Sequence, residues 1–310
     1  MSSSHRPGLA SLVHPMDARR FLDEHWPDRP YCTHGPLDRL GSLARAPQLR
    51  SFAAMLKAER RSIRAWMRDS EGRHRTAVVT ANQAEHFYAT GAVTISIDSV
   101  AVPAVRRMGE RLRRELGPSV RAVSCNAYVS PGGRGTTALH FDDHEVFAIQ
   151  LRGRKRWSFA PNLHVPSPLV DYAVGMEVKP ELRALCRRLP ETLPEDAATA
   201  VLEPGSVLFL PRGYWHLTDT LEPSVHLTLA VAGTSWADLV VGRIRERLVR
   251  DEEWRRTATG LTGSRAARTR ARRHLTSLLT PLSRELETLL DVDRLTAQYG
   301  GRDGNEASHV

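Results

Sequence analysis

Cysteine is scarce in this sequence, with only Cys32, Cys125 and Cys186 among 310 residues. An odd number at wide spacing argues against a disulfide framework and against a zinc site built from several thiolates, so we expect a cytoplasmic protein. The first thirty residues hold no apolar stretch of signal-peptide length and no eighteen apolar residues follow one another, so we expect neither secretion nor a membrane span. A chain of this length builds its core without metal, which leaves any bound metal free for chemistry.

Acidic residues are outnumbered by lysine and arginine, 35 against 44, which gives a formal charge of +9. Much of this excess lies between Arg243 and Arg273, where eleven arginines accompany four acidic residues. Such a segment suggests nucleic acid as a partner. Arginine also outnumbers lysine throughout the chain, as in proteins from high-GC genomes, so composition explains the segment equally well. Nucleic-acid binding therefore stays open but is not the favoured interpretation.

Residues 1–117 are expected to form a helical and extended region that packs on the domain behind it. The pattern predicts a short helix over 17–25, capped by Asp17, and the prolines that follow it require extended or turning chain. A second helix is predicted over about 101–117, where apolar residues recur at helical spacing before a Gly-Pro pair.

Residues 118–233 alternate between apolar and polar positions and predict an all-β core. The alternating segments are AVSCNAYV, EVFAIQLR, KRWSFA, SVLFLP and SVHLTLAV. Residues from about 165 to 200 break the pattern with prolines and a weak helical period, so we expect an insertion between two halves of a sheet system.

Residues 234–310 return to a helical and basic pattern. Ser235 and Asp238 have the spacing of an N-terminal cap, and a further helix is predicted from Thr280, with Pro281 in its first turn. An apolar stripe follows the cap at Trp236, Leu239, Val240, Ile244 and Leu248. Because a tail of 77 residues has little core of its own, this stripe needs a partner surface, and we expect a homodimer.

The motif His140-Phe141-Asp142 points to metal chemistry. It lies at the entrance to the strand EVFAIQLR, and residues two apart in extended chain face the same way, so both polar side chains reach one point. His216 follows a buried strand and a turn with proline and glycine in LFLPRGYWHLTD. Two histidines and one carboxylate form a triad that leaves coordination positions open and selects non-heme Fe(II), whereas a structural zinc site closes with a fourth ligand.

Alternative interpretations of these histidines stay open. An HxD pattern arises by chance, and a lone strand histidine is more often a satisfied polar residue than a ligand. The surrounding short strands favour the ligand interpretation, because a double-stranded β-helix would bring these segments together. His226, in SVHLTLAV, is a rival third ligand. We rank His216 first because a strand-end turn faces a barrel mouth, and we expect His226 beside the site.

Over residues 17–232 the chain resembles the JmjC-type cupin proteins known as ribosomal oxygenases. The segments that carry the resemblance, in order, are FLDEHWPDRPYCTHG, CNAYVSPGG, HFDDHEVFAIQLRGRKRWSF, LFLPRGYWHLT and SVHLTLAV. The resemblance implies a mainly β, double-stranded β-helix (cupin) fold that uses Fe(II) with 2-oxoglutarate as cosubstrate. It also implies that His140, Asp142 and His216 are the metal ligands and catalytic residues.

The resemblance assigns a cosubstrate pocket as well. Lys155, fifteen residues after the first histidine, matches the cation that receives the far carboxylate of 2-oxoglutarate. Alternation supports this, because Lys155 shares a strand face with Trp157 and Phe159, while its neighbours Arg154 and Arg156 point outward. Asn126, Tyr128 and Thr228 match or approach positions that line the pocket. Asn126 and Tyr128 have a second interpretation, since the two can satisfy each other.

The family members hydroxylate arginine or histidine of ribosomal proteins, so we expect a peptidyl hydroxylase with a protein or peptide substrate. The family's dimerisation helices are followed by a winged-helix domain, and the tail after Gly233 is too uniformly helical for one. A tailoring hydroxylase of a ribosomally synthesised peptide natural product is therefore the alternative. An alternative of another class is a non-catalytic cupin that binds nucleic acid through the basic tail.

Overall fold

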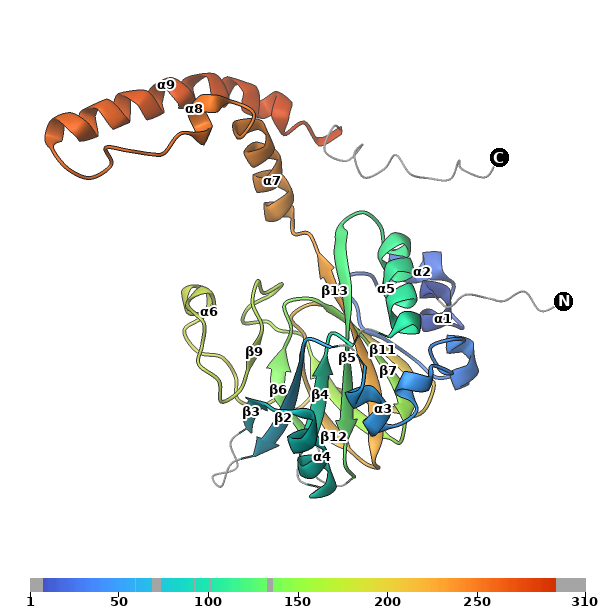
Figure 1. Ribbon diagram of the computed structural model, residues 1–310. Coiled ribbons are helices and arrows are strands. Elements are labelled where there is room, and N and C mark those ends of the chain that lie inside the picture. The colour runs from blue at the N-terminus through green and yellow to red at the C-terminus, as the bar shows by residue number, and fades with distance from the viewer. Residues whose placement is uncertain are drawn as a thin grey trace. The chain divides into compact units, whose positions relative to one another are not determined.

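The computed structural model describes residues 8–293, apart from residues 59, 69–73, 92, 101 and 133–135. The chain divides into two compact units, Met1–Gly233 and Thr234–Val310. The first holds the β-strands and most of the helices, and the second is helical (Figure 1). Within the described residues, no helix has both the length and the apolar character that crossing a membrane would require.

Two antiparallel sheets form the first unit. The larger has the strand order β1-β11-β7-β13-β5-β4-β2-β3 and the smaller β10-β8-β12-β6-β9. In that order the larger sheet comprises Tyr31–Thr33, Val207–Leu210, Glu145–Arg152, Ser224–Gly233, Val120–Ser130, Thr94–Asp98, Ser62–Arg68 and His74–Val78. The smaller comprises Ala198–Leu202, Lys155–Ala160, Trp215–Thr220, Thr136–Phe141 and Tyr172–Ala173. From β5 onward the chain passes repeatedly between the sheets, which is the double-stranded β-helix that the sequence predicts.

Alternation along β13 separates the barrel interior from the main apolar core. Leu227, Leu229 and Val231 belong to a core cluster that also contains residues of the N-terminal helices. The intervening His226 and Thr228 are buried on the other face, inside the barrel. The barrel interior therefore combines these polar side chains with a second apolar cluster that includes Val146, Trp157 and Leu208, while the outer face of the larger sheet packs against helices.

Three α-helices of the first unit begin at a side-chain cap, at Asp17, Ser51 and Thr80. Asp17 accepts hydrogen bonds from the backbone N–H groups of Arg19 and Arg20 and so caps α2, as the sequence predicts. The α-helices are α1 Leu9–Val13, α2 Ala18–Glu24, α3 Phe52–Leu56, α4 Ala81–Ala89, α5 Pro103–Glu115 and α6 Pro180–Leu185. Two 3-10 helices, η1 Leu37–Leu40 and η2 Pro47–Leu49, complete the set.

The N-terminal segment also supplies strands that the sequence analysis did not predict. Strands β2, β3 and β4 extend the larger sheet beyond β5, with β4 pairing antiparallel to β5. The signal was weak because β4 buries Thr94 and Ser96 alongside its apolar residues, which hides the alternation. Its pairing partner β5 begins more than twenty residues after β4 ends, so the two strands lack the short turn sequence that predicts a hairpin.

The HxD motif occupies a different strand from the expected one. His140 and Phe141 end β6 in the smaller sheet, and Asp142 follows that strand, whereas β7 begins only at Glu145. The expectation that the motif opens the EVFAIQLR strand was therefore wrong. The ligand atoms of His140 and Asp142 nevertheless lie within 4.8 Å of each other, so both side chains reach one point as the sequence predicts.

The second unit contains α7 Trp236–Leu248, α8 Glu252–Arg255 and α9 Arg265–Leu289. Ser235 and Asp238 form the predicted capping box at the start of α7. The prediction of a helix beginning at Thr280 was wrong, because α9 begins after Ser264 and runs through Pro281. Ser264 caps this helix sixteen residues before Thr280, so the proline removes one backbone hydrogen bond from a helix that is already nucleated. The predicted module continues to residue 310, and residues after 293 lie outside the described residues.

Candidate metal centre and active site

His140, Asp142 and His216 meet at the mouth of the barrel. Each offers one ligand atom, and these atoms lie within 4.8 Å of one another. The antiparallel pairing of β12 with β6 places His216 directly opposite His140, with ring centroids 4.0 Å apart. A backbone hydrogen bond from Gly213 N to the carbonyl oxygen of Asp142, 2.9 Å long, ties the turn before His216 to the HxD motif.

Hydrogen bonds fix the tautomers of both histidines. His140 Nδ1 lies 2.7 Å from the carbonyl oxygen of Ala138, and His216 Nδ1 lies 2.9 Å from that of Tyr214. A carbonyl oxygen only accepts, so each Nδ1 carries the proton and each Nε2 keeps a free lone pair. Backbone carbonyls orient metal-binding imidazoles in this way. Both rings therefore present Nε2 as a ready ligand atom.

Charge and burial suit the cluster to a cation. Burial, with the nearby charge of His140, lowers the pKa of His216 to about 4, so this imidazole is neutral near neutral pH. Burial opposes ionisation of Asp142, but the neighbouring histidines outweigh it and hold the pKa of its carboxyl below the usual range. Two imidazoles and one carboxylate are the donor set of non-heme Fe(II) sites, so the residues present fit this ion.

A small closed cavity of about 20 Å³ continues from the cluster into the barrel. Two of the predicted pocket residues, Tyr128 and Thr228, line it together with Trp157 and His226. The His226 ring stacks on that of Tyr128 at 4.7 Å, and its Nδ1 is buried without a hydrogen-bond partner among the described residues. His226 does not belong to the ligand cluster, so the structure brings His216 to the motif and leaves the rival candidate beside the site.

Lys155 is fully buried at the start of β8, two residues before Trp157. Its Nζ donates to Ser130 Oγ at 2.9 Å, and within the described part of the chain it forms no salt bridge. Burial lowers the pKa of this ammonium to about 7. The predicted strand orientation is confirmed, because Trp157 and Phe159 are also buried while Arg154 and Arg156 are exposed. A buried ammonium held only by a hydroxyl fits the far carboxylate of a dicarboxylate.

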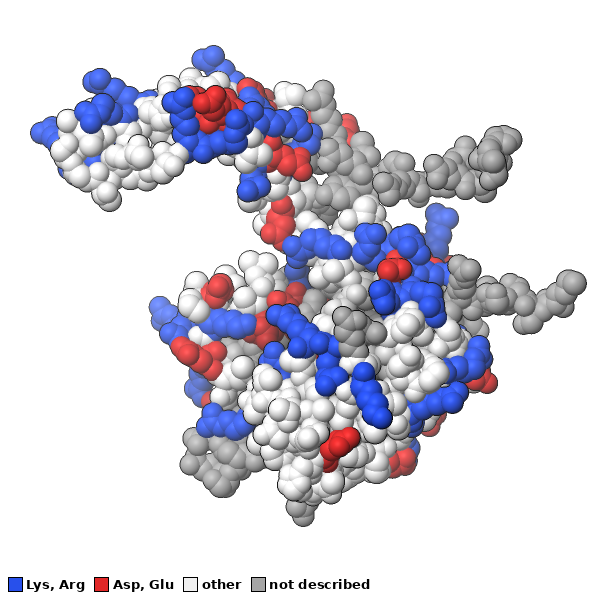
Figure 2. Space-filling model, viewed as in Figure 1, with Lys and Arg blue, Asp and Glu red and all other residues white. Residues whose placement is uncertain are grey.

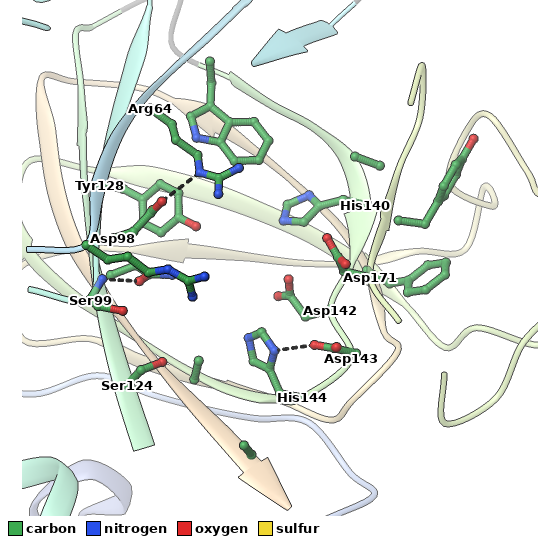
Figure 3. Close-up of a pocket in the computed structure, with 18 of the residues that line it drawn as sticks. Arg64, Asp98, Ser99, Ser124, Tyr128, His140, Asp142, Asp143, His144 and Asp171 are labelled. Atoms are coloured by element: carbon green, nitrogen blue, oxygen red, sulfur yellow. Dashed lines mark hydrogen bonds and ion pairs between the residues drawn. The ribbon is translucent and has the colours of Figure 1, made fainter. Parts of the chain in front are cut away.

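A larger pocket of about 410 Å³ opens on the other side of the cluster (Figure 3). His140 and Asp142 form part of its wall, and so do the predicted residues Asn126 and Tyr128. Asn126 Oδ1 accepts a hydrogen bond from Ser99 N at 2.9 Å, and its side chain also bonds the Tyr128 hydroxyl. Both interpretations of this pair therefore hold, since the two residues contact each other and line the pocket.

Sequence reasoning missed the wall of this pocket that the N-terminal strands supply. Arg64 and Trp66 lie on β2, and Arg64 Nε donates to Asp98 at 2.8 Å. Figure 3 shows the Arg64 guanidinium and the Asp98 carboxylate beside Tyr128, across the pocket from Asp142. The segment SIRAWMR places Arg64 and Trp66 on one face, which was the available signal.

The profile of the JmjC domain matches residues 102–239. Residues 102–239 form a JmjC domain. This domain contains the three residues of the metal-binding cluster, Lys155 and the residues that line the small cavity.

Two relatives match the chain over different lengths. The uncharacterized protein YxbC of Bacillus subtilis (strain 168) is 29% identical over 303 residues, which cover 93% of this chain and 90% of that protein. Ribosomal oxygenase 2 of Rattus norvegicus is 35% identical over 142 residues, 44% of this chain, and this match spans only 27% of that protein.

Solved structures share the fold of the JmjC domain. The X-ray structure of E. coli ycfD has a TM-score of 0.52 at 18% identity and covers 85% of this chain and 68% of that one. A structure of the same protein, described as a ribosomal oxygenase in complex with cobalt and succinic acid, has a TM-score of 0.50 at 19% identity and covers 86% and 67%. The chain therefore shares a JmjC-type fold with these proteins, and its His-Asp-His cluster lies within that domain.

Proposed function

We propose that the protein is a peptidyl hydroxylase that uses Fe(II) and 2-oxoglutarate to convert a C–H bond of a protein side chain into C–OH. The observation that carries the proposal is the cluster of His140, Asp142 and His216, which lines both a small cavity inside the barrel and a larger open pocket. Fe(II) with 2-oxoglutarate and O₂ supplies the oxidising chemistry, which yields the hydroxylated product, succinate and CO₂.

The chain's own residues divide the work between two sides of the cluster. His140 Nε2, His216 Nε2 and an Asp142 oxygen would hold the metal. Lys155 would receive the far carboxylate of 2-oxoglutarate through a charge-assisted hydrogen bond, since its ammonium is buried, donates to Ser130 and forms no salt bridge among the described residues. Tyr128 and Thr228 line the space between and offer hydroxyl groups for the same cosubstrate.

The open pocket would receive the substrate. Its wall combines the Trp66 ring, 6.3 Å from the His140 ring, with charged groups such as Arg64 and Asp143. A pocket of about 410 Å³ accepts one extended side chain rather than a folded domain. This geometry suits a residue presented on a flexible segment of a protein, and the ribosomal oxygenase relatives make ribosomal proteins the first substrates to test.

The test uses the full chain with purified ribosomal proteins of the source organism, Fe(II), ascorbate and 2-oxoglutarate. We expect one ribosomal protein to gain the mass of one oxygen at an arginine or histidine, and no gain with Asp142→Ala. If 2-oxoglutarate is turned over but no ribosomal protein is modified, the substrate class is wrong while the oxygenase assignment remains. Peptides encoded beside this gene would then be the next substrates.

A further inference from the structure

Five arginines lie within nine residues at the start of α9, and all of them are exposed: Arg265, Arg268, Arg270, Arg272 and Arg273. The sequence contains no acidic residue between Glu253 and Glu285. The oxygenase chemistry proposed above uses none of these arginines. In Figure 2 the end of the helical unit where α9 begins shows blue and white atoms, while red atoms gather near α8.

Several acidic residues of this unit pair with arginines that lie outside the start of α9. Arg247 pairs with Glu285 through two nitrogens, at 2.7 and 2.9 Å, and Arg256 pairs with Glu252 and Glu253. Among the described residues, the five arginines at the start of α9 form no salt bridge, and Arg268 bonds only the carbonyl oxygen of Gly263. Their charge is therefore available to a partner.

The positive charge of these arginines lies at the N-terminus of α9, the end of a helix where positive charge is least favourable. The helix dipole makes the N-terminus of α9 partly positive, and the first turn contains Arg265 and Arg268 but no acidic residue. The usual arrangement is the reverse, with acidic residues first and basic residues last. A bound polyanion would turn this unfavourable placement into a favourable one.

The side chains between these arginines are short. The loop before α9 covers one side, since a Cβ added at Gly260 would lie 3.1 Å from the Ala267 carbonyl oxygen and 3.3 Å from the Ala271 Cβ. The other residues in this stretch, Ala266 and Thr269, are also short. Residues 265–273 themselves contain no large apolar side chain, whereas Leu261 and Leu275 on either side of them are exposed, so the experiment below includes acidic vesicles.

We propose that the start of α9, residues 265–273, binds the phosphate backbone of RNA. Arginine guanidinium groups bind phosphate oxygens through two hydrogen bonds, and the short residues let the helix approach a groove closely. Duplex RNA is recognised by shape and backbone contacts, the mode open to a helix that carries arginine but no asparagine or glutamine. The choice of RNA over DNA also rests on the proposed function, because a ribosomal protein lies beside RNA.

The test measures binding of the full chain to a short fluorescein-labelled RNA duplex by anisotropy over a range of salt concentrations. The key variant combines Arg265→Gln, Arg268→Gln and Arg272→Gln, which lie on one face of α9. The matched control combines Arg113→Gln, Arg114→Gln and Arg187→Gln, exposed arginines of the first unit, and removes the same charge. A second variant, Arg270→Gln with Arg273→Gln, covers the case in which the first one misfolds, and circular dichroism reports folding.

We expect the α9 triple variant to raise the Kd for RNA at least about tenfold and to reduce the slope of log K against log salt by roughly 2–3, because about three phosphate contacts are lost. The control triple should change Kd less than about threefold. An equal loss in both triples would overturn the proposal, since diffuse charge would then explain the binding. It is also overturned if the wild-type chain fails to bind RNA at low salt, or binds DNA duplex or phosphatidylglycerol vesicles more tightly. None of these outcomes depends on turnover, so they leave the oxygenase assignment untouched.

Discussion

The Lys155 ammonium lies 2.9 Å from the Ser130 hydroxyl oxygen inside the barrel, and the described residues provide no carboxylate to pair with it. An unpaired buried cation costs free energy, and its pKa, lowered by burial to about 7, reports that cost. A cosubstrate with a free carboxylate would supply the missing partner.

Replacing Lys155 should weaken binding of 2-oxoglutarate much more than binding of the metal. A charge-assisted hydrogen bond contributes about 1.5–3 kcal/mol, so Lys155→Ala should raise the KM for 2-oxoglutarate by roughly one to two orders of magnitude. Lys155→Arg should be milder. The exposed neighbours serve as controls, and Arg154→Ala or Arg156→Ala should change this KM less than about threefold. A large effect at Arg154 with none at Lys155 would show that the anion is held outside the barrel.

Cosubstrate binding should also take up a proton near pH 8. With a pKa of about 7, Lys155 is mostly neutral at pH 8 in the empty barrel and mostly charged at pH 6. A bound carboxylate favours the charged form and raises this pKa, so binding takes up a proton above pH 7 and almost none below it. Calorimetry of the manganese-loaded protein in buffers of different ionisation enthalpy measures this uptake, roughly 0.9 proton at pH 8. The Lys155→Arg variant remains charged throughout and should take up none. Equal uptake in both proteins would contradict the assignment.

Alanine variants of His216 and His226 should differ in their affinity for the metal. His216 presents a free Nε2 to the cluster, whereas His226 lies outside it. We expect His216→Ala to weaken Fe(II) or Mn(II) binding by more than the roughly 10–100-fold that groups behind a ligand contribute. His226→Ala should leave metal affinity within that range or unchanged. An apo protein from His226→Ala would mean that the third ligand is His226.

The helical unit should hold two copies of the chain together. On α7, the Trp236 side chain is 79% exposed and that of Val241 is 61% exposed, and large apolar groups seldom remain exposed on an unpaired helix. We predict a homodimer by light scattering at micromolar concentration and a shift toward monomer with Val241→Glu. Leu163→Glu, an equally drastic change at a residue 81% exposed in the first unit, is the control. A wild-type monomer would refute the prediction.

The sequence revealed the barrel and its ligand cluster because both depend on local periodicity. The side-chain period of two in KRWSFA was enough to place Lys155 inside and Arg156 outside. The order strand-turn-histidine was enough to select His216 over His226, since a strand-end turn lies at the barrel mouth.

Features that depend on distant pairing were not visible in the sequence. Strand β4 joins the sheet through a pairing of Ile95 with Val129, and nothing near Ile95 specifies that partner. The pocket wall built by Arg64 and Asp98 was missed for the same reason, because both lie on these added strands. At Pro281 a reliable local rule failed, because a helix started far upstream continued through the proline.

The most direct test of the central claim is Fe(II)-dependent conversion of 2-oxoglutarate to succinate by the purified chain, followed by NMR. The account predicts turnover by the wild-type protein and background succinate from His140→Ala and from Asp142→Ala, with circular dichroism unchanged because neither residue belongs to the apolar core. Undiminished succinate formation in both variants, or none from the iron-loaded wild-type protein, would contradict it.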